Sequence, residues 1–385
     1  MKLADRLATI KPFRVMEIME RAAQLEASGR SVIHMEVGEP DFAVCKEISA
    51  AGVEAIARGD TKYTSATGLP ELRRTISSYY GGFGVEIDPE RIVVTSGGSG
   101  GLLLLAAALL NPSDRVLVTD PGYPCNEVFA ETVGAHVSRV PVFAQNHFQP
   151  RWSDLLAQWD DSVRGALLAS PSNPTGTMIR RQEMQSIVVQ ACDRGFLIID
   201  EIYQGLVGDD PEYRTVLSLS SQPIVLQSFS KYFGMTGWRL GWIVIPEVLI
   251  DGVRRLAQNL FISPSTIAQR AAMAAFSVDA IAEHERRRKI FRDRATHMQR
   301  GVERLGLAVP ATPDGAFYLY VDVSASGMSA SDFSRRLLDE QLVATTPGLD
   351  FGVVNTERYL RIACTVDVDV MDLVLDRIAL ALKRG

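Results

Sequence analysis

The sequence predicts an α/β protein with a large domain built on a mostly parallel β-sheet and a smaller α+β domain. From about residue 90, short apolar runs alternate with helical segments. These runs are apolar along their whole length, which is typical of strands covered on both faces of a parallel sheet. After residue 280 the alternation gives way to a long charged helical segment, followed by shorter strands and helices.

The predicted strands of the large domain each run into a turn rich in Gly, Pro or polar residues. They are the apolar runs in "RIVVTSGG", "DRVLVTDPGYP", "RGALLASPSNPTGT", "FLIIDEIY" and "PIVLQSFSK". Helical segments such as "SGGLLLLAAALL" and "RRQEMQSIVVQACDRG" lie between them. Ligands of such sheets bind at the carboxyl ends of the strands. The polar residues found there are therefore candidates for a site: Ser99, Tyr123, Asn173, Asp200, Tyr203, Ser228, Ser230 and Lys231.

The C-terminal part predicts a second domain. Residues 280–306 form a long charged helix, whose interleaved Glu and Asp indicate a solvated face rather than a nucleic-acid site. A strand in "DGAFYLYVDV", a helix in "SASDFSRRLLDEQ", short strands in "VATTPG" and "RYLRIAC" and a closing helix follow. We expect the N-terminal arm to pack with this domain. The large domain then comprises residues 45–285, and the small domain residues 1–44 plus 286–385.

Composition excludes several classes of protein. A net charge of −6 over 385 residues argues against nucleic acid as the main partner. The longest apolar run, residues 102–110, is too short to span a bilayer, and the N-terminus lacks the uninterrupted apolar region of a signal peptide. Four scattered cysteines without a CxxC pattern favour the reducing cytoplasm, and the five histidines show no metal-ligand spacing.

Three features at the predicted strand ends point to one ligand. Asp200 is a carboxylate at the end of a buried strand with no Lys or Arg near it in sequence, which suits a cationic ligand nitrogen. The turn "SGGSGG" opens a helix whose N–H groups attract an anion such as phosphate, and Arg239 could complete that site. Lys231 lies in a short turn between two apolar runs, where its amine could form a covalent bond to the ligand.

The glycine-rich turn matches neither GxGxxG nor GxxxxGK[ST], so dinucleotide-binding and P-loop interpretations fail. A ligand with a phosphate, a protonatable ring nitrogen and a group that a lysine amine can attack remains. Pyridoxal phosphate has all three features.

The chain resembles the class I (fold type I) pyridoxal-phosphate-dependent aminotransferases. The motifs that carry the resemblance are "VGEPDF", "YTSATGLPELR", "VTSGGSG", "SPSNPTGT", "IIDEIY", "SFSKYFGMTGWRLGW", "PDGAFYLY" and "TTPGLDFG", in family order over nearly the whole chain. The resemblance implies a seven-stranded, mostly parallel sheet in an α/β/α sandwich with a smaller α+β domain. It also implies a homodimer that shares its active sites across the interface.

The resemblance implies roles for individual residues around pyridoxal phosphate. Lys231 would carry the cofactor as a Schiff base and then shuttle the substrate proton, while Asp200 would keep the pyridine nitrogen protonated. Asn173 and Tyr203 would bind the ring oxygen, and Tyr123 would stack on the ring. The phosphate would be held by Gly98, Ser99, Gly100, Ser228, Ser230 and Arg239, with Tyr63 reaching it from the neighbouring subunit. Arg361 would bind the substrate carboxylate, with Gly38 and Asn173 beside it.

Simpler interpretations exist for some of these residues. Taken alone, Tyr123 could be a core residue, Asp200 a helix N-cap, and Arg361 could face solvent by strand alternation. The stretch "RIACTVD" after Arg361 departs from the more usual family ending, so the side-chain pocket cannot be carried over.

The substrate is expected to be a neutral aliphatic or aromatic amino donor, with 2-oxoglutarate or pyruvate as acceptor. Ser99 stands where some relatives with acidic substrates place a lysine, and Phe13 and Arg14 of the N-terminal arm could line the pocket. Two alternatives stay open: a pyridoxal-phosphate β-lyase on the same scaffold, and a non-catalytic cofactor-binding sensor. The form of "SPSNPTGT" favours the transaminase over the lyase. The early start of the family match and the presence of both Lys231 and Asp200 argue against the sensor.

Overall fold

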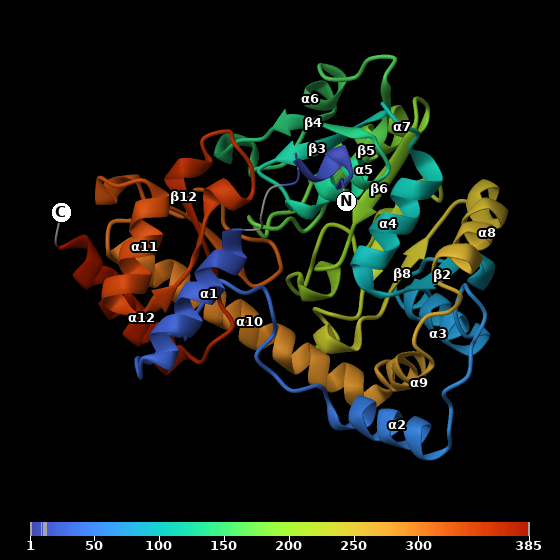
Figure 1. The fold of residues 1–385 in the computed structure, drawn as a ribbon, viewed down its shortest axis with the longest axis horizontal. Helices are drawn as coiled ribbons and strands as arrows, with labels where there is room; N and C mark the ends of the chain where they lie inside the picture. Colours follow the sequence, from blue (N-terminus) through green and yellow to red (C-terminus); the bar gives the residue numbers. More distant parts are fainter. Residues whose placement is uncertain (1, 9, 11–13, 384–385) are drawn as a thin grey trace.

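A seven-stranded sheet forms the centre of the large domain in the computed structural model, which describes residues 2–8, 10 and 14–383 (Figure 1). Its strand order is β2-β8-β7-β6-β5-β3-β4, and the pairs from β7 to β4 are all parallel. β8 runs antiparallel to both β2 and β7. The predicted mostly parallel sheet is therefore confirmed. The strands are β2 (Ile92–Thr95), β3 (Arg115–Asp120), β4 (His136–Pro141), β5 (Val163–Ala169), β6 (Phe196–Asp200), β7 (Ile224–Ser228) and β8 (Gly241–Val244).

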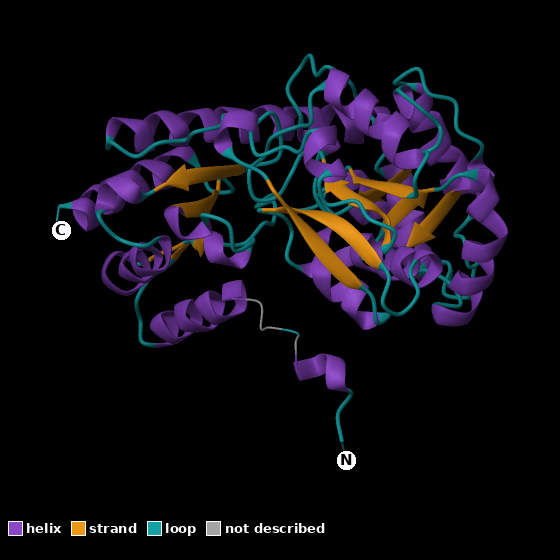
Figure 2. Ribbon diagram, turned by 90° about the horizontal axis from the view of Figure 1, so that it is seen from above, coloured by secondary structure: helices purple, strands orange, loops and turns teal. Residues whose placement is uncertain are grey.

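Helices cover both faces of this sheet (Figure 2). They are α2 (Lys46–Ala57), α3 (Pro70–Gly81), α4 (Gly97–Leu109), α5 (Cys125–Thr132), α6 (Trp152–Leu156), α7 (Arg181–Cys192), α8 (Ile250–Leu260) and α9 (Thr266–Ala274). Successive residues of a strand point to opposite faces. Accordingly, Val225 joins one apolar cluster while Ile224 and Leu226 join another. This explains why β7 is apolar at consecutive positions.

The long helix α10 (Val278–Arg304) contacts α2 of the large domain and α12 (Val368–Leu382) of the small domain (Figure 1). The predicted domain boundary at residue 285 falls inside this helix. Because the helix contacts both domains, the structure does not test that boundary, and it stays a prediction. None of the helices in the described part of the chain is long and apolar enough to cross a membrane.

The small domain is built from two short sheets and three helices around its own apolar cluster. β9 (Tyr318–Asp322), β12 (Tyr359–Ala363) and β11 (Thr346–Pro347) form an antiparallel sheet, while β1 (Ile33–His34) pairs with β10 (Val343–Ala344). The segment "VATTPG", expected as one strand, is thus divided between two sheets. The helices α11 (Ala330–Gln341) and α12 pack on this core.

The N-terminal helix α1 (Arg14–Ala27) lies against the small domain (Figure 1). Its residues Ala22 and Leu25 are buried in a cluster with Leu338 and Ala344. The short segment before α1 contacts the large domain instead, where the guanidinium of Arg6 donates to the carbonyl of Thr132.

Candidate active site

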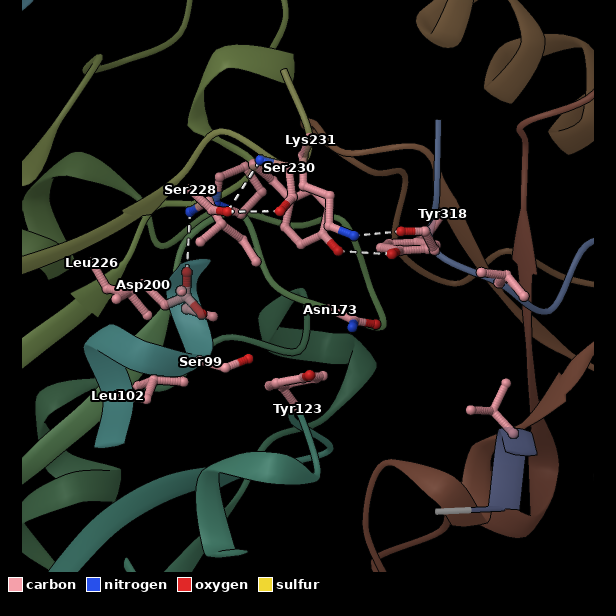
Figure 3. Close-up of a pocket in the computed structure, with 18 of the residues that line it drawn as sticks. Ser99, Leu102, Tyr123, Asn173, Asp200, Leu226, Ser228, Ser230, Lys231 and Tyr318 are labelled. Carbon is pink, nitrogen blue, oxygen red and sulfur yellow. Dashed lines mark hydrogen bonds between the residues drawn. The ribbon is translucent and has the colours of Figure 1, made fainter. Parts of the chain in front are cut away.

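A cavity of about 300 Å³ lies at the carboxyl ends of the central strands, bordered by α4, the small domain and α1. Figure 3 shows Lys231 and Ser230 on one side of it, with Tyr123 and Ser99 on the opposite side. Most of the predicted site residues line this cavity: Gly38, Gly98, Ser99, Tyr123, Asn173, Asp200, Tyr203, Ser228, Ser230, Lys231, Arg239 and Arg361.

The start of α4 and Arg239 form one wall of the cavity. A Cβ atom on Gly97, which has φ +72°, would lie 2.6 Å from Nη2 of Arg239, so only glycine lets the guanidinium approach this turn. On the other side, a Cβ on Gly241 would lie 2.8 Å from the Gly97 carbonyl carbon and 3.0 Å from the Gly98 nitrogen. The free N–H groups of the first helical turn and this cation suit an anion. Arg239 itself is exposed at this wall.

Two serines complete this side of the cavity. The Ser228 hydroxyl donates to that of Ser230 at 2.9 Å, and the Ser230 amide donates to Ser228 Oγ at 3.1 Å. Both side chains are buried at the end of β7, close to the turn that carries Lys231. They add hydroxyl groups beside the anion site.

Asp200 ends β6 as a buried carboxylate. Its Oδ1 accepts a hydrogen bond from the Ile202 amide at 3.0 Å, and among the described residues no Lys or Arg forms an ion pair with it. Burial raises its pKa to about 7, although the Ile202 bond and the charge of Lys231 act in the opposite direction. Such a group is prepared to bind a cationic nitrogen.

Lys231 projects into the cavity from the turn after β7. Its Nζ donates to the carbonyl of Gly38 and lies 5.9 Å from the ring centre of Tyr203. Burial, followed by the charges of Arg361 and Arg239, lowers the pKa of Lys231 to about 8. A substantial share of neutral amine near pH 8 makes Nζ a competent nucleophile and base.

Arg361 is buried on β12, which excludes the solvent-facing interpretation. Its guanidinium lies between the rings of Tyr318 and Phe351, with the central carbon 4.5 and 4.7 Å from their centres. Nη1 donates to Asn173 Oδ1 at 2.8 Å and Nη2 to the Glu36 carbonyl. Nε has no partner among the described residues, so the guanidinium can still donate to a ligand carboxylate.

Tyr203 and Tyr318 form a buried hydroxyl pair at 2.7 Å, and Figure 3 shows Tyr318 near Lys231. Tyr318 is a cavity residue that the sequence interpretation missed, although "PDGAFYLY" was one of the recognised motifs. Its position depends on Gly38, because a Cβ there would overlap the Tyr318 hydroxyl. Gly38 therefore serves both the tyrosine pair and the lysine, whose amine bonds its carbonyl.

Gly38→Ala should displace Tyr318 and break its bond to Tyr203. We expect a loss of about 1–3 kcal/mol in the free energy of unfolding, as for overpacked cores, together with a lower kcat. Denaturant unfolding and steady-state kinetics measure both. Gly252→Ala is the control, because nothing lies within 4 Å of its Cβ and alanine favours the helix α8. A Gly38→Ala enzyme as stable and active as Gly252→Ala would contradict the packing seen here.

Two predicted residues do not line the cavity in the single chain. Gly100 lies one residue further along α4 than Ser99, and Tyr63 is 81% exposed. Their proposed contacts to a phosphate are not tested by this structure and stay predictions. A role for Tyr63 requires a second subunit.

The N-terminal arm contributes residues other than those expected. Val15, Met16 and Met19 of α1 line the cavity. Of the two residues named from the sequence, Phe13 lies outside the described residues, and Arg14 contributes its backbone amide to Asp350. No local pattern distinguishes Met16 from the other apolar residues of an amphipathic helix, because its contact to the cavity comes from the tertiary fold.

Comparison with known proteins gives a consistent result. The family model for aminotransferase class I and II matches residues 30–378. The chain is 36% identical over 368 residues to a valine–pyruvate aminotransferase of Mycobacterium tuberculosis, with 94% of each chain covered. It is 31% identical over 385 residues to an aspartate aminotransferase of Pyrococcus horikoshii, covering 99% of this chain and 97% of that protein. A solved aminotransferase structure from Mycobacterium tuberculosis superposes with a TM-score of 0.95, 35% identity and complete coverage of both chains.

Proposed function

The chain belongs to the class I and II aminotransferases, enzymes that depend on pyridoxal phosphate, and we propose that its amino donor is a neutral aliphatic or aromatic L-amino acid. The observation that carries the proposal is the apolar surface of Val15, Met16 and Met19 at the α1 side of the cavity. The acceptor is a 2-oxo acid such as pyruvate or 2-oxoglutarate.

The charges that line the cavity support a neutral donor. Its described cationic residues are Lys231, Arg239 and Arg361, and each already has a proposed task. Among the residues that the structure describes, no further cation lines the cavity to bind a second carboxylate. The relatives include a valine–pyruvate and an aspartate aminotransferase. The apolar lining at α1 suits an aliphatic side chain such as that of valine better than the carboxylate of aspartate.

The residues present fit pyridoxal phosphate. The buried Asp200 carboxylate lacks a cationic partner among the described residues and suits the ring nitrogen, while the α4 turn and Arg239 suit the phosphate. Tyr123 would cover the ring, with Asn173 and Tyr203 at its oxygen. When bound, the cofactor supplies an aldehyde that a lysine amine can attack and a ring that accepts electrons from the substrate Cα.

In the mechanism we propose, Arg361 binds the donor carboxylate, and its stacking between Tyr318 and Phe351 fixes the plane of the guanidinium. Lys231 Nζ would hold the cofactor through its aldehyde carbon, and once free the amine would take the proton from the donor Cα and pass it to that carbon. The Asp200 carboxylate would stabilise positive charge on the ring nitrogen. The hydrogen bond between Tyr203 and Tyr318 would fix the Tyr203 hydroxyl that is proposed to bind the ring oxygen.

A homodimer and a cytoplasmic location belong to the same proposal. Tyr63 is exposed and so is available to reach the phosphate of a neighbouring subunit. The four cysteines are all free, in keeping with a reducing compartment.

The donor proposal predicts the outcome of a half-reaction assay. Single amino acids are added to the holoenzyme without any oxo acid, and the visible absorbance of the bound cofactor is followed. Valine, leucine and phenylalanine should convert it with a rate constant at least about tenfold above that for aspartate, since the described residues of α1 that line the cavity are apolar. Faster conversion by aspartate would contradict the neutral donor. With an amino acid that carries a β-leaving group, such as the thiol of cysteine, release of pyruvate, ammonia and the leaving group without conversion of the cofactor would favour the β-lyase alternative.

A further inference from the structure

The loop of residues 348–356 connects several parts of the cavity wall. Phe351, within it, stacks on Arg361, and its carbonyl accepts from the Gly122 amide at 2.8 Å. Gly122 directly precedes Tyr123, so the loop contacts both the carboxylate-binding arginine and the turn that carries the ring-covering tyrosine.

Asp120 attaches this loop firmly to the large domain. Its buried carboxylate accepts from the amide of Val353 at 3.1 and 3.0 Å and from that of Val354 at 3.3 Å. A Cβ on Gly352 would overlap this carboxylate, so glycine permits the close approach. The loop is thus a fixed support at the junction of the two domains.

The same loop holds the start of α1 through Asp350. This carboxylate, 7% exposed, accepts from the Arg14 amide at 3.0 Å through Oδ1 and from the Val15 amide at 3.2 Å through Oδ2. These are the first two residues of α1 as described. Amides in the first turn of a helix lack intrahelical acceptors. Here both acceptors are oxygens of one side chain that lies more than three hundred residues further along the sequence.

The residues of α1 at the cavity depend on this attachment. Met16 and Met19 are 56% and 36% exposed, so packing within the chain does not fix them. The second half of the helix is held by Ala22 and Leu25 in the apolar cluster and by the 2.9 Å contact of Arg21 with Asp339. At the cavity end, the described contacts that fix the helix backbone are the two bonds to Asp350.

We propose that Asp350 is a positioning residue for donor selection: by holding the first turn of α1, it keeps Val15, Met16 and Met19 against the side-chain end of the cavity. This inference rests on the proposed neutral donor. Asp350 acts through α1 and does not contact the reacting atoms. Its loss should affect donors whose side chains reach α1, such as leucine, more than alanine.

The test uses Asp350→Ala and Asp350→Asn holoenzymes, with Asp88→Ala as a matched control. Asp88 also accepts from a backbone amide, that of Glu90 at 2.9 Å, but is not among the residues that line the cavity. Hydrogen–deuterium exchange of the α1 amides and steady-state kinetics with leucine or alanine plus a saturating 2-oxo acid are measured. Asp350→Ala should raise exchange in the first turn of α1 and lower the leucine-to-alanine ratio of kcat/KM by roughly tenfold, mainly through KM for leucine.

Asp350→Asn keeps one acceptor and should give an intermediate result, which also preserves the test if the alanine variant fails to fold. Asp88→Ala should change neither quantity. Unchanged exchange in α1, or raised exchange with an unchanged leucine-to-alanine ratio, would overturn the proposal. If the wild-type enzyme reacts with aspartate and not with leucine, the neutral donor is wrong, and the exchange measurement still decides whether Asp350 holds α1.

Discussion

Lys231→Ala is expected to abolish multiple turnover while leaving the fold intact. The variant loses both the amine that attaches the cofactor and the base that moves the Cα proton. Loss of a positioned acid–base group alone costs about 10²–10⁴-fold in rate, and the missing covalent attachment adds to this. Because the wild-type pKa is lowered to about 8, mainly by burial, the substitution also removes a costly buried charge, and the fold should tolerate it.

The measurement combines steady-state kinetics with intact mass after borohydride reduction. Wild-type protein should gain the mass of the cofactor on Lys231, and the alanine variant should gain none there. Lys46→Ala is the control, since the side chain of Lys46 is 90% exposed and is not among the residues that line the cavity. Normal turnover by Lys231→Ala would falsify the assignment of this lysine.

Much of the fold could be predicted from the sequence because its signals are local. Strands buried on both faces, such as β6 and β7, begin with a run of consecutive apolar residues and end in polar ones, so their existence and order follow directly. The division of "VATTPG" into β10 and β11 could not be predicted. It depends on two different partners, β1 and β12, which come from opposite ends of the chain.

The same distinction applies to the site. Asp200 and Lys231 lie at strand ends within recognisable motifs, and the structure brings both to the cavity. Tyr318 and Met19 were missed because their contacts to the cavity are tertiary, with no spacing that marks them. Arg239 shows a third case: the sequence placed it at the anion site, but the Gly97 turn that makes room for its guanidinium at the cavity wall is seen only in the structure.

Asp200→Asn should lower the rate of Cα deprotonation by about 10²–10³-fold, the usual effect of removing one preorganised electrostatic partner. Asparagine keeps the size of the side chain and can still accept from the Ile202 amide, but it carries no negative charge to hold a cationic ring nitrogen. Single-turnover absorbance with a saturating neutral donor measures this step. Glu54→Gln is the control, because Glu54 lies on α2 with its side chain 59% exposed. An unchanged rate in Asp200→Asn would contradict the role of the carboxylate.

Although Asp200→Asn should slow the reaction, it should increase the stability of the protein without cofactor. In the folded chain the pKa of Asp200 is raised to about 7, above its value when unfolded. Between these two values the folded state binds a proton that the unfolded state releases, so the free energy of unfolding falls as pH rises through this window. Asp200→Asn lacks this loss, and the cofactor-free variant should be more stable than wild type at pH 8, by a few kcal/mol at most. The difference should shrink toward pH 5, where the wild-type carboxyl is largely protonated in the folded state. Denaturant unfolding at both pH values measures it. A less stable variant at pH 8 would mean that Asp200 is held by other charges, and that its position at the end of β6 does not depend on a cationic ligand.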